Sequence, residues 1–306
     1  MRIRTFIKHP LILMLIALVF VGIGCLGGVT AKLLLRTAGI LDTIPGRAIQ
    51  VSFFIVFTTC CYQFYLKKFE HRPMTEYGTP RWFSKVLIGI AIGSGLILVQ
   101  VGFLWITGNY HITEFQPDQE VIKYIFLMIL IGFIEELIAR GIVFRLVEKW
   151  AGSIIALLVV AIEGGLTHAT NPNATLWSSV AVGLEFGVLM TLVYMATRNL
   201  WVVSSLHFAW NFTMGGIFDI AVSGTDAQSL FKATLEGPVW LTGGAFGIEA
   251  GTPAILITII SSAILIRYLK NNNGFKPPNW RTNEKNVSRD SIPVIVHDPD
   301  HSSMRH

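Results

Sequence analysis

Charged residues and cysteines are both scarce in this sequence. Only 14% of the 306 residues are charged and 52% are hydrophobic, whereas about a quarter of the residues in soluble domains are charged. This composition excludes an ordinary soluble domain and indicates an integral membrane protein. Lysines and arginines lie at the ends of apolar segments instead of on one face, which argues against nucleic-acid binding. The three cysteines, Cys25, Cys60 and Cys61, lie within apolar segments and predict neither a disulfide framework nor a metal site.

Long apolar segments recur along the chain. Since about 20 apolar residues cross a bilayer as a helix, the sequence predicts an all-α membrane bundle of about eight transmembrane helices. The segments are approximately 10–34, 48–66, 84–107, 121–146, 152–168, 175–197, 200–217 and 252–270. The first apolar run is too long for a typical signal peptide, so we expect an uncleaved first span.

Composition also divides the chain. Residues 1–118 are almost uniformly apolar within their spans and are expected to form a scaffold. Residues 119–270 hold the polar spans and the last span, and they are expected to carry the functional core. Residues 271–306 are rich in Asn, Pro, Asp and Ser and predict a flexible, polar cytoplasmic tail.

Basic residues alternate from one side of the predicted membrane to the other. One side carries most of them, namely Arg2, Arg4, Lys8, Lys67, Lys68, Arg72, Arg81, Lys85, Arg145, Lys149, Arg198, Arg267, Lys270, Lys276, Arg281, Lys285, Arg289 and Arg305. The other side carries little more than Lys32, Arg36, Arg47, Lys123 and Lys232. By the positive-inside rule both termini are cytoplasmic, and we expect an integral protein of a bacterial inner (plasma) membrane.

Ionisable residues inside a span cost roughly 2.5–3.5 kcal/mol each on insertion scales, so each needs a partner or a function. They concentrate in the fourth to seventh segments, at Glu135, Glu136, Arg140, Glu163, His168, Glu185 and His207 with Asn211.

The sequence GFIEELIARG contains three of these residues. Glu136 and Arg140 are four residues apart, so they share a helix face and can form an ion pair. Glu135 lies about 100° away around the helix axis. It is therefore less neutralised by the arginine, which suits a general base.

Two histidine elements follow. His168 ends the fifth segment, where THATNPN interrupts the helix. His207 and Asn211 are four residues apart on one helix face, where their N–H groups can converge on a developing oxyanion. Together with a carboxylate base, these residues are the groups needed to hydrolyse an acyl bond with activated water.

Structural roles are the competing interpretation. A single histidine in an apolar helix more often makes an interhelical hydrogen bond, and an intramembrane Glu–Arg pair can be structural or part of a transport path. For Glu163, Glu185 and Asp219 we favour a structural role. The combination of the first cluster with both histidine elements, contributed by three spans, favours a site.

These motifs resemble a known family. Glu135-Glu136-Leu-Ile-Ala-Arg140 fits EExxxR, and His207-Phe-Ala-Trp-Asn211 fits HxxxN, of the CAAX protease and bacteriocin-processing (CPBP) family, also called type II CAAX prenyl endopeptidases or the Abi family. The resemblance covers about residues 120–217. The family's middle motif is FxxxH, but the residue four before His168 is Gly164, so packing behind this histidine is expected to be looser.

The resemblance implies catalytic roles for four residues. Glu135 would activate water with help from His168, and His207 with Asn211 would stabilise the oxyanion. Glu136 and Arg140 would orient the helix and tune the base. We favour a mechanism without a metal cofactor because no HExxH motif is present. Zinc is the alternative, held by Glu135, His168 and His207.

The leading hypothesis is an intramembrane endopeptidase that cuts a peptide bond near the cytoplasmic side. Its partners would be the bilayer and a substrate that is a prenylated C-terminus, a peptide precursor or a membrane protein. The alternative is a non-catalytic membrane scaffold or regulator that retains the fold. An ion-coupled transporter ranks lowest, because paired half-repeats are not visible. The sequence does not specify an oligomeric state.

Overall fold

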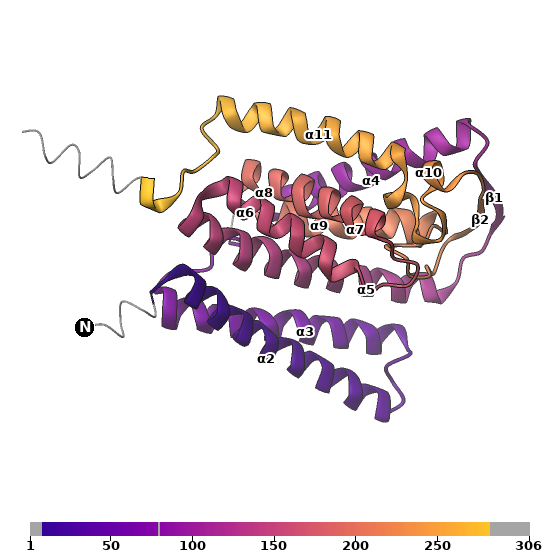
Figure 1. Ribbon diagram of the computed structural model, residues 1–306. Helices are drawn as coiled ribbons and strands as arrows, with labels where there is room; N and C mark the ends of the chain where they lie inside the picture. Colours follow the sequence, from indigo (N-terminus) through magenta and orange to yellow (C-terminus); the bar gives the residue numbers. More distant parts are fainter. Residues whose placement is uncertain (1–7, 79, 282–306) are drawn as a thin grey trace, which may run out of the picture.

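A computed structural model describes residues 8–78 and 80–281 of the chain, and it is built almost entirely of helices (Figure 1). The α-helices are α2 (Pro10–Thr37), α3 (Ile44–Tyr65), α4 (Trp82–Ile106), α5 (Gln119–Glu136), α6 (Arg145–His168), α7 (Leu176–Val182), α8 (Thr191–Thr197), α9 (Leu200–Asn211), α10 (Val239–Thr242) and α11 (Thr252–Asn271). The predicted all-α class is confirmed.

Five helices within the described residues are long and apolar enough to cross a membrane. They are Pro10–Thr37, Ile44–Glu70, Trp82–Ile106, Leu176–Thr197 and Thr252–Asn271. The other three predicted segments, 121–146, 152–168 and 200–217, are helical but do not meet the same criterion. These three contain most of the ionisable residues of the predicted site. The count of eight spans is therefore not confirmed.

Wider, π-helical turns interrupt the helices around the predicted site. They are η1 (Leu66–Glu70), η2 (Leu137–Phe144), η3 (Gly183–Met190) and η4 (Phe212–Ile217); η2 contains Arg140 and η4 directly follows Asn211. Short 3-10 turns, η5 (Gly244–Phe246) and η6 (Ile248–Ala250), precede α11. A π turn is a local insertion in the helical repeat that often accompanies a functional site, because it redirects the side chains that follow it.

Polar caps set where the site helices begin. The Asp118 side chain accepts a hydrogen bond from the Glu120 amide at the start of α5, and the Asn199 side chain accepts one from the Trp201 amide at the start of α9. Thr175 and Ser178 form a reciprocal capping box at the start of α7. These caps satisfy backbone N–H groups that lack a partner within the helix.

Glycines allow α9 to pack closely between α4 and α5. A β-carbon at Gly93 would lie 2.3 Å from the Leu206 carbonyl oxygen, and one at Gly132 would lie 2.7 Å from the Ser204 carbonyl oxygen. Small residues at helix contacts are a common solution in membranes, since they allow backbones to approach. The helix that carries His207 is therefore fixed from two sides.

A two-stranded antiparallel sheet closes one end of the bundle, opposite the end where α2 begins and α11 finishes (Figure 1). It pairs β1 (Tyr110–Phe115) with β2 (Phe231–Leu235), with a register irregularity between Ile112 and Glu114. This sheet was not expected from the sequence. Its strands are short and far apart in the chain, so no local sequence pattern predicts that they pair.

At the other end of the bundle, the chain after α11 packs onto the protein. We call residues 272–281 the C-terminal strap. The Lys276 amide donates to Ser153 Oγ (2.8 Å), and the Ser153 amide donates to the Lys276 carbonyl (3.0 Å). Gly152 turns the chain there with φ of 81°. The first part of the predicted flexible tail is thus held in place, and residues 282–306 lie outside the described part of the chain, as do Arg2 and Arg4.

Candidate active site

Glu136 lies at the centre of a buried polar cluster. Its side chain is inaccessible to solvent, and its Oε1 accepts hydrogen bonds from Arg140 Nη1 and from His207 Nδ1, each at 2.9 Å. The predicted Glu136–Arg140 ion pair is therefore confirmed. The contact with His207 was not expected, because spacing along one helix says nothing about which neighbouring helix faces the pair.

Glu135 points elsewhere, as the helical spacing predicted. Its side chain retains 43% exposure, whereas that of Glu136 retains none. The Glu135 Oε2 atom lies 3.9 Å from His207 Nε2. One imidazole is thus placed between two carboxylates, with Nδ1 bonded to the buried one and Nε2 facing the accessible one.

Glu135 lines a cavity of about 340 Å³ together with His168. The other lining residues are Ile138, Ala139, Arg140, Val160, Glu163, Gly164, Thr167, Asn171, Phe186 and Gly187. The structure thereby brings the carboxylate of one motif and the histidine of another to the same space. Glu163, for which the sequence favoured a structural role, also lines this cavity.

The ring of His168 is held in a defined orientation. Its Nδ1 lies 2.8 Å from the Gly164 carbonyl oxygen, and because a carbonyl only accepts, Nδ1 carries the proton. Thr167 Oγ1 lies 3.2 Å from the same nitrogen. The ring is thereby fixed through Nδ1, and Nε2 is the ring nitrogen available to contact a water molecule.

Phe186 supplies the aromatic packing that position 164 lacks. Its ring stacks on His168 with centroids 6.0 Å apart and interplanar angle 21°, and its centroid lies 4.6 Å from that of His207. One phenyl ring therefore packs against both histidines. The expected loosening behind His168 is offset by a residue from η3, which the sequence could not assign because it lies outside the motif.

Asn211 is buried and has no hydrogen-bond partner for its Oδ1 within the described residues. It lies on α9 one turn after His207. Neither Asn211 nor His207 is among the residues that line the cavity around Glu135. The structure therefore brings His207 to both glutamates, whereas Asn211 contacts neither the cavity nor, within the described residues, a partner for its Oδ1.

A further buried carboxylate, Glu249, lies in η6, outside all three motifs, and contacts the helix that carries His207. It is fully buried and accepts hydrogen bonds from Trp210 Nε1 (3.1 Å) and from the amide and hydroxyl of Ser223 (2.8 Å each). The Ser223 carbonyl in turn accepts from Asn171 Nδ2. Burial raises the pKa of Glu249, and these hydrogen bonds together with the nearby His168 act in the opposite direction. Only the fold reveals this support, because residue 249 is far along the chain from every motif.

The donor set does not form a metal site as placed. Among the residues that the structure describes, no group of three or more His, Cys, Asp or Glu side chains is arranged to hold an ion. Nδ1 of both histidines is already engaged, by Gly164 and by Glu136. We therefore derive no step through zinc, and the choice between a metal-free and a zinc mechanism stays a prediction.

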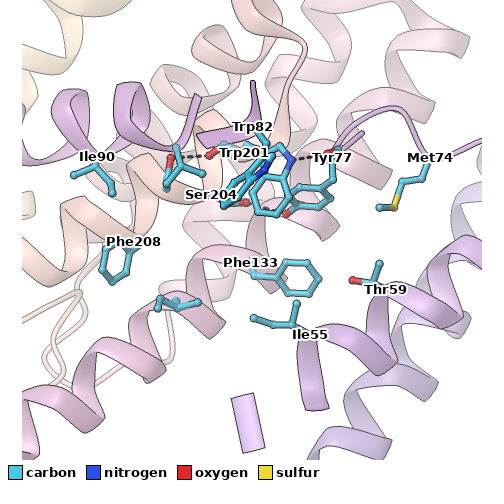
Figure 2. Close-up of a pocket in the computed structure, with 13 residues that line it drawn as sticks. Ile55, Thr59, Met74, Tyr77, Trp82, Ile90, Phe133, Trp201, Ser204 and Phe208 are labelled. Carbon is cyan, nitrogen blue, oxygen red and sulfur yellow. Dashed lines mark hydrogen bonds between the residues drawn. The ribbon is translucent and has the colours of Figure 1, made fainter. Parts of the chain in front are cut away.

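A larger, apolar groove of about 420 Å³ lies on another side of the α5–α9 contact and shares no lining residue with the cavity around Glu135. Figure 2 shows Trp201 between Trp82 and Tyr77 at this groove, with Phe133 and Phe208 also lining it. Trp201 Nε1 donates to the Tyr77 carbonyl, and the Tyr77 hydroxyl lies 2.9 Å from Ser204 Oγ. The groove is thus a fixed apolar surface near the site.

The comparisons with known proteins agree with the motifs. Residues 117–213 match the family described as "Type II CAAX prenyl endopeptidase Rce1-like". No curated protein and no solved structure matches the chain. The matched segment contains all six predicted site residues, Glu135, Glu136, Arg140, His168, His207 and Asn211. With its apolar spanning helices, the chain is therefore an integral membrane protein whose residues 117–213 belong to the Rce1-like, type II CAAX prenyl endopeptidase family of proteases.

Proposed function

We propose that the protein is an intramembrane endopeptidase that hydrolyses a peptide bond with water activated by Glu135. The observation that carries this proposal is the placement of His207 between a buried and an accessible carboxylate, next to a cavity that also contains His168. A base, an oriented imidazole and a space for the scissile bond are the elements of acyl hydrolysis.

In this mechanism, Glu135 and His168 hold a water molecule in the cavity. Glu135 accepts a proton as the water oxygen attacks the scissile carbonyl carbon, and the carbonyl oxygen becomes an oxyanion. The tetrahedral intermediate collapses when the C–N bond breaks, and the proton held by Glu135 passes to the departing amine. The products are a carboxylate and an amine.

His207 is suited to stabilise the oxyanion. Its Nδ1 is hydrogen-bonded to Glu136, which orients the ring as a buried aspartate orients the histidine of serine proteases. Its Nε2 faces Glu135 and the space for the reacting carbonyl, where an N–H at this position would donate to the oxyanion. Asn211 would contribute its amide N–H once the substrate occupies the site, and it is the less direct of the two donors because it does not line the cavity.

We further propose that the substrate is a membrane-tethered peptide. The apolar groove of Figure 2 offers a surface for the apolar part of such a substrate, whether a lipid-modified C-terminus or a hydrophobic segment of a precursor or membrane protein. Extended apolar contacts of this kind supply binding energy that positions a scissile bond.

The test is cleavage of quenched fluorescent peptides by the purified protein. One peptide carries an isoprenoid on a C-terminal CAAX cysteine, and a second is identical but unmodified. We expect wild type to cleave and Glu135→Gln to lose activity by about 10³-fold or more, as loss of a catalytic base does. Glu163→Gln is the matched control, because it neutralises another carboxylate that lines the same cavity.

Equal activity of wild type and Glu135→Gln would refute the mechanism. If neither protein cleaves any peptide and both support the same cellular phenotype, the non-catalytic scaffold or regulator is favoured. A chelator added to the same assay decides the metal question: a zinc enzyme loses activity and regains it with added Zn²⁺, whereas the metal-free mechanism is unaffected.

The side of the membrane from which the site is reached needs its own test. His168 ends α6 and Asn171 bonds to Ser223, so this end of the cavity lies away from the basic residues at the start of α6. With both termini cytoplasmic, as proposed from the positive charges, His168 lies nearer the outer face than the sequence analysis expected. In intact cells, an impermeant thiol reagent should then label Thr170→Cys and not Lys276→Cys. The reverse pattern would show that cleavage takes place from the cytoplasmic side.

A further inference from the structure

A third cavity, of about 580 Å³, opens at the end of the bundle where α6 begins. Arg72, Arg145, Lys149, Arg198 and Lys276 line it with two acidic residues, Glu76 and Glu148. Four separate parts of the chain supply the cations: the loop after η1, the start of α6, the turn between α8 and α9, and the C-terminal strap. We call this cavity the basic pocket.

The carboxylates of the basic pocket are buried and the cations are more exposed. The side chains of Glu76 and Glu148 are 4% and 2% exposed, whereas those of Arg198 and Lys276 are 36% and 59% exposed. Glu148 accepts from both Arg198 Nη atoms and from Lys276 Nζ (2.9 Å). The carboxylates therefore form the floor and hold the cations in place at the opening.

Positive charge remains after this pairing. Arg72 and Arg145 both bond to Glu70, which is buried and does not line the pocket, and counting this third carboxylate still leaves an excess of two cations. Lys149 is exposed and makes no ion pair with any residue in the described ranges. Arg198 has a fork of five N–H donors, of which the Glu148 contact uses two.

The position of the basic pocket indicates where an anion would come from. It lies at the ends of helices that cross the membrane, and Trp150 and Trp280 pack together beside it with ring centroids 6.1 Å apart. Tryptophans are enriched where a membrane protein meets the headgroup layer. Basic pockets between helices at this level bind anionic lipid headgroups.

We propose that the basic pocket binds the phosphate-bearing headgroup of an anionic phospholipid. The phosphate oxygens accept from the exposed faces of Arg198, Lys276 and Lys149, and the acyl chains extend along the outside of the bundle. Because the strap supplies Lys276, a bound lipid joins the strap to the start of α6. This site is independent of peptide hydrolysis.

The test measures lipids that stay bound to the purified full-length chain by native mass spectrometry. Wild type is titrated with phosphatidylglycerol or with phosphatidylcholine at equal concentrations. We expect preferential retention of phosphatidylglycerol, and about 25-fold weaker retention in Lys149→Gln/Lys276→Gln, since each lysine near a membrane surface contributes roughly fivefold in affinity. Lys67→Gln/Lys68→Gln is the matched control, because it removes the same charge from exposed residues outside the pocket; it should retain the wild-type preference.

Equal retention of the two lipids by wild type would overturn the proposal, and so would equal losses in the pocket variant and the control. Displacement of phosphatidylglycerol by excess inorganic phosphate would assign the pocket to a soluble anion instead. The single variant Lys149→Gln controls for misfolding, because Lys149 makes no ion pair in the part of the chain described and its substitution should leave the fold intact. It should weaken retention about fivefold, and unchanged retention would count against the site.

Discussion

Replacing Glu136 by Gln tests the central geometry of the site, because it keeps the shape of the side chain and removes its charge. Oε1 of Glu136 bonds to both Arg140 and His207 at 2.9 Å, and the arginine side chain is only 3% exposed. Removing one partner of a buried ion pair leaves the other charge uncompensated, which costs roughly 3–5 kcal/mol. We therefore expect Glu136→Gln to lower the free energy of unfolding by about that amount.

The neighbouring residue provides the contrast. Glu135→Gln acts on a side chain that is 43% exposed and whose carboxylate approaches His207 Nε2 only to 3.9 Å. Its effect on stability should stay within about 0.5 kcal/mol, as for most exposed substitutions. Adjacent glutamates should thus differ by several kcal/mol in stability while both variants lose peptidase activity.

Thermal and denaturant unfolding of the purified protein in one detergent measures this difference. The double variant Glu136→Gln/Arg140→Gln removes both charges of the pair and should recover part of the stability lost by the single change. Two results would contradict the role assigned to the buried cluster. One is an equal loss of unfolding free energy in Glu135→Gln and Glu136→Gln. The other is a loss in the double variant that exceeds the sum of the losses in Glu136→Gln and Arg140→Gln.

Three further outcomes follow from packing and charge. Phe186→Leu should lower kcat about tenfold with little change in KM, because it removes the ring that packs on both site histidines; an unchanged kcat in the peptide assay would contradict this. Gly187→Leu should prevent stable folding, since even a β-carbon there would lie 2.4 Å from Ala161 Cα; size-exclusion chromatography would show whether a monodisperse protein forms. Burial alone would raise the pKa of Glu148, but hydrogen bonds from Arg198 and Lys276 lower this pKa below its ordinary value. The ionised Glu148 therefore stabilises the fold at pH values above its unfolded pKa of about 4.3. This stabilisation is lost as the pH falls through the lower pKa of the folded state. The protection factor of the Lys276 amide, which is its exchange rate corrected for the intrinsic pH dependence of exchange, should therefore fall in acid, and a pH-independent protection factor would show that this contact does not hold the strap.

The sequence alone was sufficient for the membrane class, the helical architecture and the division of Glu135 from Glu136. These depend on local properties: the length of apolar runs, the excess of basic residues at their ends, and the 100° between adjacent positions on a helix. The family motifs supplied the candidate residues, and the segment match agrees with them.

Contacts between distant segments could not be predicted in this way. The bond from His207 to Glu136, the packing of Phe186 on two histidines, and the support from Glu249 each join residues that no periodicity relates. Three of the eight predicted spans do not meet the combined criteria of length, hydropathy and charge for a membrane-crossing helix among the described residues.

The sequence by itself therefore determined which residues are costly to place in a membrane, because that cost depends on residue type and on the apolar length around it. Only the tertiary structure decided which partner or cavity stabilises each of these polar side chains. Glu136 is paired with Arg140 and hydrogen-bonded to His207 in a buried cluster, Glu135 faces a cavity, and the basic residues after η1, at α6 and in the strap converge on one pocket. Such convergence depends on how helices pack against one another, and the residue pattern within one helix does not specify which other helices it contacts.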